Sequence, residues 1–139
     1  ESSGGLTVAG HIHGKDGVYA ASLLVEMVAK TGKSLSELMH EISREYGGSH
    51  MEERAYSLPE DVKESLQHRL FVEKEIPPMW PYPVERVSYM DGCKIYLENG
   101  GWLSARFSGT EPLLRIFCEM PTQKETQELC DSMAKYFQI

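Results

Sequence analysis

The stretch RFSGTEPLLR, residues 106–115, joins two segments in which apolar and polar side chains alternate. Alternation with a period of two is typical of half-buried strands, so residues 102–107 and 113–119 are expected to form a hairpin around the Ser-Gly-Thr turn. The alternation also predicts two faces for this hairpin. The core face is expected to carry Leu103, Ala105, Phe107, Leu114, Ile116 and Cys118, and the other face Arg106, Ser108 and Arg115.

Further strand signals lie upstream of this hairpin. Residues 51–56, 84–90 and 93–98 read as strands, and the dipeptides Asp91-Gly92 and Asn99-Gly100 are typical of hairpin turns. Several strands joined by tight turns and flanked by helices indicate an α+β fold. We therefore expect one antiparallel sheet with helices on one face.

Helix signals are clearest where Ser or Thr precedes Glu by three residues, which is the capping-box pattern. This pattern predicts helices that begin at Ser34, Ser57 and Thr122, with Pro59 in the first turn of the helix that begins at Ser57. The apolar positions of residues 18–31 predict another amphipathic helix before them.

The first two helices have no strand of their own to cover. Gly32 is expected to end the helix over residues 18–31, and Gly47-Gly48 to end the helix that begins at Ser34. The double glycine is also the expected domain boundary, which gives segments 1–48 and 49–139. The first segment therefore reads as part of a larger domain.

Composition excludes several classes of function. The 139 residues carry a net charge of −7, which argues against a nucleic-acid partner, and no apolar run reaches membrane-spanning length. The three cysteines, an odd number without CxxC spacing, read as reduced thiols of a cytoplasmic protein. Because the chain opens at Glu1 without a methionine, it is expected to be a fragment.

The loop between the two strands of the opening hairpin has the chemistry of an anion site. Its backbone N–H groups and hydroxyls can converge on one point, and a guanidinium beside them can bind a phosphate through two parallel hydrogen bonds. Arg106 and Arg115 are the only cations between Ile95 and Gln123. The alternative is a plain hairpin loop with two solvated arginines.

The whole string Arg-x-Ser-Gly-Thr-Glu-Pro resembles the phosphate-binding loop of the α-D-phosphohexomutase superfamily, which comprises phosphoglucomutases, phosphomannomutases and phosphoglucosamine mutases. The resemblance implies the TBP-like fold of the family's fourth domain for residues 49–139. It also assigns phosphate contact to Arg106, Ser108, Gly109 and Thr110, with a supporting role for Arg115.

The N-terminal stretch ESSGG, residues 1–5, taken alone reads as a flexible linker. It also looks like the family's sugar-binding loop, Glu-x-Ser-Gly, and the following GHI and KDG strings, residues 10–12 and 15–17, are similar to the family as well. By this resemblance Glu1 and Ser3 contact the sugar hydroxyls. Residues 1–48 would then be the end of the family's α/β third domain. Separately, His11 is a minor candidate for ligand contact, since a lone histidine in a glycine-rich loop is more often incidental.

The resemblance implies a parent enzyme that interconverts hexose 1-phosphate and hexose 6-phosphate through a phosphoserine and a bisphosphate intermediate, with Mg²⁺ and a hexose bisphosphate activator. The family's serine loop and acidic metal loop have no counterpart in this sequence. We therefore expect no catalytic residue and no metal ligand here, and an inactive fragment whose partners are a hexose phosphate and the absent domains. The alternative from another class is a non-catalytic anion-binding or protein-interaction module with the same fold.

Overall fold

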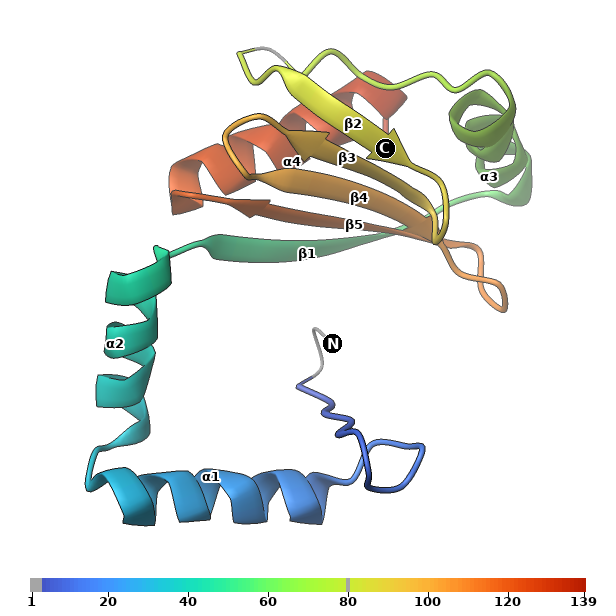
Figure 1. The fold of residues 1–139 in the computed structure, drawn as a ribbon. Helices are drawn as coiled ribbons and strands as arrows, with labels where there is room; N and C mark the ends of the chain where they lie inside the picture. Colours follow the sequence, from blue (N-terminus) through green and yellow to red (C-terminus); the bar gives the residue numbers. More distant parts are fainter. Residues whose placement is uncertain (1–3, 80) are drawn as a thin grey trace. The chain divides into compact units, whose positions relative to one another are not determined.

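The computed structural model describes residues 4–79 and 81–139 (Figure 1). The chain divides into two compact units, residues 1–47 and residues 48–139. The first contains helices α1 (Gly17–Thr31) and α2 (Leu35–Tyr46). Among the described residues, no helix combines the length and the apolar character needed to cross a bilayer.

Local capping explains where both helices of the first unit begin. The Asp16 carboxylate accepts from the Tyr19 N–H at the start of α1, and Gly32 ends this helix in the left-handed conformation with φ 67°. At the start of α2, Ser34 and Glu37 form the predicted capping box. The predicted stop at Gly32 and the predicted cap at Ser34 are therefore confirmed.

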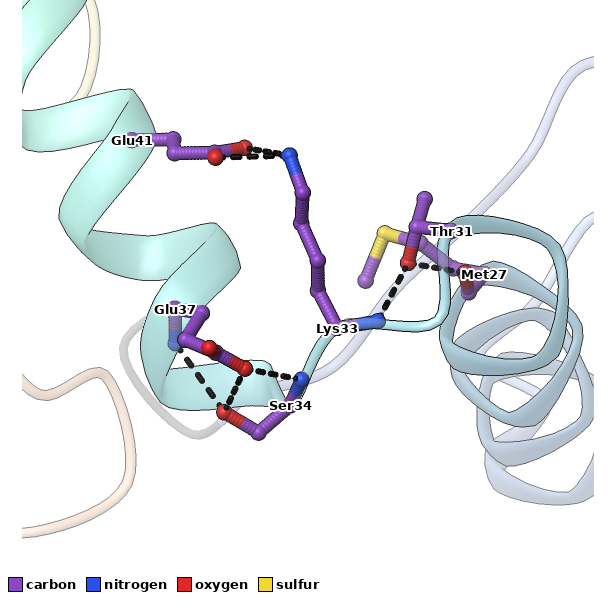
Figure 2. A network of polar contacts seen from close by, with 6 residues as sticks. All are labelled: Met27, Thr31, Lys33, Ser34, Glu37 and Glu41. Atoms are coloured by element: carbon purple, nitrogen blue, oxygen red, sulfur yellow. Dashed lines mark hydrogen bonds and ion pairs between the residues drawn. The ribbon is translucent and has the colours of Figure 1, made fainter.

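The turn between α1 and α2 carries its own polar network, which Figure 2 shows from close by. The Thr31 hydroxyl donates to the Met27 carbonyl, and the Lys33 ammonium contacts both carboxylate oxygens of Glu41, at 2.6 and 2.8 Å. All of these contacts are local and exposed or partly buried. They fix the turn without creating a core for this unit.

The second unit is built on a five-stranded antiparallel sheet with the order β1-β5-β4-β3-β2. Its helical elements are α3, the π-helical turn η1 that follows it, and α4. The α+β fold expected from the sequence is confirmed. The bounds are β1 His50–Ser57, α3 Glu60–Gln67, η1 His68–Val72, β2 Val84–Ser88, β3 Cys93–Leu97, β4 Trp102–Phe107, β5 Leu113–Met120 and α4 Gln123–Phe137.

One face of the sheet makes the core of this unit together with α3, η1 and α4. The strand residues assigned to the core by alternation are buried, with Phe107 partly buried against them, while Arg106 and Arg115 are exposed on the opposite face. We call this second face, which no helix in the described part of the unit covers (Figure 1), the open face. The core also holds all three cysteines as free thiols.

Two polar clusters tie helical segments to the rest of the second unit. Arg54 on β1 contacts Asp131 on α4, and this contact raises the pKa of Arg54. Arg69 holds both oxygens of Glu75, at 2.7 and 2.8 Å, and the Tyr136 hydroxyl donates to the same carboxylate at 2.6 Å. Arg69, with Tyr136 second, lowers the pKa of Glu75 to about 2.

The predicted capping box at Ser57 is wrong. Ser57 is the last residue of β1 and pairs with Leu113, so its backbone belongs to the sheet ladder. Helix α3 begins after Pro59, which is the N-cap with ψ 147° and provides no side-chain cap. Pro59 therefore lies just before the first turn of α3, whereas the sequence predicted it inside that turn.

Both predicted hairpins form, each with a four-residue loop. β2 ends at Ser88, earlier than expected, so residues 89–92 make the first loop, in which Gly92 has φ 79°. Residues 98–101 make the second loop, closed by hydrogen bonds between Leu97 and the two glycines Gly100 and Gly101.

Candidate functional site

The loop between β4 and β5, residues 108–112, is held at both ends. The Ser108 N–H donates to the Leu113 carbonyl at 2.8 Å, which closes the hairpin. The Pro112 carbonyl accepts from the Leu58 N–H at 2.9 Å, which fastens the loop to the segment between β1 and α3. The middle of the loop is exposed and therefore accessible to a ligand.

Backbone N–H groups converge in this loop, around the Ser108 hydroxyl. Its oxygen accepts from the N–H of Thr110 at 3.4 Å and of Glu111 at 3.2 Å. Both are long for hydrogen bonds, so an anionic oxygen could replace or share this acceptor. No hydrogen bond from the Gly109 N–H is formed within the described part of the chain. Since the Ser108 N–H is used by the hairpin, the donors of the expected nest are those of residues 109–111.

The two arginines predicted for the site lie side by side. Arg106 and Arg115 are directly opposite each other in the β4–β5 register, and both are exposed on the open face. Like charges placed opposite each other in a sheet are unfavourable. A carboxylate lies beside each guanidinium. The Asp91 Oδ1 atom is 3.3 Å from Arg106 Nε, and the Glu53 Oε1 atom is 3.7 Å from Arg115 Nη1. A bound anion near this pair would relieve the remaining repulsion.

The open face carries more positive charge than the sequence indicated. Arg86 lies 3.4 Å from the centre of the Tyr96 ring, and Lys94 lies 3.7 Å from the centre of the Trp102 ring. A hollow of about 320 Å³ on this face is lined by Lys94, Trp102 and Arg106, among others. Arg86 and Lys94 both lie before Ile95, outside the segment in which the sequence indicated focused positive charge. The alternation of β2 and β3 was the signal that could have placed them here.

The predicted sugar-contacting pair, Glu1 and Ser3, lies outside the described residues. The loop that follows is compact. The aliphatic stem of Lys15 crosses Gly5, where a Cβ atom would lie 2.5 Å from the Lys15 Cδ atom. A side chain at Gly5 would therefore displace the lysine stem.

His11 has a structural position in this N-terminal loop. Its Nε2 atom lies 2.9 Å from the Asp16 carboxylate, and its ring stacks on Tyr19 with 4.1 Å between centroids. The contact with His11 is the main reason that the pKa of Asp16 is lowered. Because Asp16 also caps α1, His11 helps to fix the beginning of this helix.

Metal ligands are not grouped anywhere in the described part of the chain, where no three or more His, Cys, Asp or Glu residues come together in a way that could hold an ion. The Mg²⁺ implied by the resemblance therefore has no ligand set among these residues.

Comparison with protein families identifies both parts of the chain. Residues 60–136 match the model described as phosphoglucomutase/phosphomannomutase, C-terminal domain. The chain belongs to the phosphoglucomutase/phosphomannomutase family. Residues 1–46 match the same family's alpha/beta/alpha domain III, so the loop 108–112 and the ESSGG stretch fall in two different family domains.

Relatives within the phosphoglucomutase/phosphomannomutase family carry several mutase names. A phosphoglucomutase/phosphomannomutase of Thermococcus kodakarensis is 29% identical over 131 residues, which cover 92% of this chain and 25% of that protein. A phosphopentomutase of the same organism is 31% identical over 107 residues, covering 77% and 22% of the two chains. A phosphoglucosamine mutase of Lactobacillus johnsonii is 29% identical over 136 residues, covering 97% and 26%. The chain spans about a quarter of the length of these curated relatives.

Proposed function

We propose that this chain is the C-terminal, substrate-binding part of a phosphohexomutase that interconverts hexose 1-phosphate and hexose 6-phosphate through a phosphoserine and a bisphosphate intermediate. In this proposal, residues 48–139 hold the phosphate group that is not reacting. The observation that carries it is the pair Arg106 and Arg115, in register on the open face beside a loop whose N–H groups converge.

The phosphate is bound mainly by Arg106. A phosphate monoester carries a charge of about −1.5 to −2 near neutral pH, which one guanidinium and a few N–H donors match in part. The hydroxyls of Ser108 and Thr110 and the Gly109 N–H complete the contact, and Arg115 supports it electrostatically. For the chain alone we expect millimolar affinity, about −4 kcal/mol, because its net charge of −7 repels anions and the rest of the site lies elsewhere.

The sugar ring is read by the ESSGG stretch, in which Glu1 and Ser3 hydrogen-bond the ring hydroxyls. Recognition of both ends of the substrate would allow the bisphosphate to bind in either orientation. The phosphoserine, the Mg²⁺ ligands and the response to a hexose bisphosphate activator belong to the rest of the parent protein. This chain contributes positioning, which is a large part of catalysis in phosphoryl transfer.

The second candidate is a non-catalytic anion-binding or protein-interaction module. The observation that favours it is the cation–aromatic cluster on the open face, where Lys94 and Trp102 could meet a protein partner. The parent sequence distinguishes the two, because a serine loop and an acidic metal loop upstream would identify a mutase.

The test is the substitution Arg106→Ala in the full-length parent enzyme. Loss of a charge-assisted bidentate contact is expected to lower kcat/KM for glucose 1-phosphate about 30- to 100-fold. Arg86→Ala, an exposed arginine on the same face, is the matched control and is expected to change it less than about threefold. The 139-residue chain, assayed with Mg²⁺ and the bisphosphate activator, should show no turnover. Unchanged kcat/KM in Arg106→Ala, or turnover by the chain alone, would overturn the proposal.

A further inference from the structure

The loop between β2 and β3 packs directly against the strand that carries Arg106. A Cβ atom at Gly92 would lie 2.5 Å from the Ala105 carbonyl oxygen and 3.3 Å from the Arg106 Cα atom. Both neighbours are backbone atoms, which cannot move aside as a flexible side chain can, and the φ of 79° also favours glycine at this position. The loop of residues 89–92 therefore packs tightly on β4 at Ala105 and Arg106.

This close packing brings Asp91, the residue before Gly92, to the side of Arg106. The Asp91 Oδ1 atom lies 3.3 Å from the Arg106 Nε atom. Nε is thus the guanidinium atom of Arg106 that faces this carboxylate. An arginine held at Nε keeps its terminal N–H pair available for a bidentate contact with a phosphate.

The pair contributes little to folding, since both side chains are largely exposed, at 73% for Asp91 and 57% for Arg106. Its effect on binding has two opposing parts. The carboxylate weakens the attraction of the arginine for an anion, but it also restricts the guanidinium plane to one orientation. If only charge mattered, removing the carboxylate would make phosphate bind more tightly.

We propose that Asp91 is a positioning residue for Arg106: it holds the Nε edge of the guanidinium so that the terminal edge is presented to the phosphate at the loop 108–112. The proposal rests on the proposed function, because it takes Arg106 to be the main phosphate contact. It predicts the opposite sign from charge alone, namely weaker phosphate binding without the carboxylate.

The experiment is an NMR titration of the 139-residue chain with inorganic phosphate. Asp91→Ala is expected to raise Kd about three- to tenfold, and Asp91→Asn less, because an amide oxygen at this position remains a possible acceptor for the Nε–H group. Glu119→Ala is the matched control. It removes a carboxylate from the same face, opposite Trp102 on β4, and should leave binding unchanged or slightly tighter. The Arg106 Nε–H resonance should be distinct in the parent chain and should shift toward that of a free arginine in Asp91→Ala only.

The variants separate the two proposals. If Arg106→Ala loses phosphate binding while Asp91→Ala binds as tightly as the parent or more tightly, the positioning role is wrong and the phosphate site remains. If the parent binds no phosphate, or Arg106→Ala binds it equally well, both proposals are wrong. Weaker binding in Asp91→Ala, together with the shifted Nε–H resonance and an unaffected Glu119→Ala, supports the positioning role.

Discussion

Helices α1 and α4 have the same length, 15 residues, and both are amphipathic, yet they are buried very differently. α4 lies against β1 and β5 and buries six of its residues. α1 buries none, and its apolar residues Val18 and Val25 are 80% and 70% exposed. An apolar stripe therefore shows that a helix needs a partner, while burial shows whether the chain supplies one.

The difference extends from these helices to the two units that contain them. The second unit has a continuous core, whereas neither helix of the first unit contains a buried residue. Residues 1–46 match an alpha/beta/alpha domain, yet their described part contains two helices and no strand, so we expect further elements of such a domain to cover α1 and α2. The candidate phosphate loop thus lies on the self-supporting unit, and the candidate sugar loop on the dependent one.

The largest expected effect is in amide hydrogen exchange. Amides of β4 should exchange only by global opening of the second unit, whereas those of α1 should exchange by local fraying. The protection factors should then differ by roughly three orders of magnitude. Equal protection in residues 18–31 and 102–107 would remove the contrast between the units.

Truncating apolar side chains should show the same contrast on a smaller scale. Ile116→Ala, at a fully buried site, is expected to lower the free energy of unfolding of the second unit by about 2–5 kcal/mol. Val25→Ala, on the exposed stripe of α1, should change it by less than about 0.5 kcal/mol. Urea denaturation followed by tryptophan fluorescence reports the second unit, which holds both tryptophans. Similar losses in the two variants would mean that the units fold as one.

Acid sensitivity should distinguish the units in a subtler way. Arg69 and Tyr136 hold the pKa of Glu75 at about 2, below its ordinary value of 4.5. As the pH falls, this carboxylate is therefore protonated in the unfolded chain before it is protonated in the folded one. The contribution of Glu75 to stability is complete above about pH 4.5 and is lost as the pH falls toward 2.

The variant Glu75→Gln removes this contribution. Its stability relative to the parent should be lowest above pH 5, and the difference should shrink as the pH falls toward 2, as measured by thermal unfolding. Glu98→Gln, which alters an exposed carboxylate, should follow the parent at every pH. A difference in stability between Glu75→Gln and the parent that stays the same at every pH would contradict the role of this carboxylate. In the first unit, Asp16 and Glu37 cap their own helices, so their protonation should affect only local structure.

Patterns within one segment were predictable from the sequence. The capping boxes at Ser34 and Thr122 and the two faces of β4 and β5 depend on residues close together in the chain, and all are present. The cap predicted at Ser57 failed because strand pairing with β5 took that residue into the sheet. Local signals are reliable only where no tertiary partner competes with them.

The surroundings of the candidate site were less predictable. The string around Arg106 was recognisable as a unit, but Asp91 and Lys94 come beside it only through the pairing of β2, β3 and β4. Strand order and the close packing of Gly92 on β4 are tertiary facts that no local pattern contains.

The most direct measurement of the phosphate site is an NMR titration of the chain with a hexose phosphate, glucose 6-phosphate. Shifts should be confined to residues 106–112 and their immediate neighbours, with a Kd on the order of millimolar. Arg106→Ala should remove most of the binding, and Arg106→Lys should restore little, because an ammonium cannot make the bidentate contact. Shifts spread over the surface, or full binding by Arg106→Ala, would show that the loop is an ordinary hairpin turn and that the phosphate is held elsewhere.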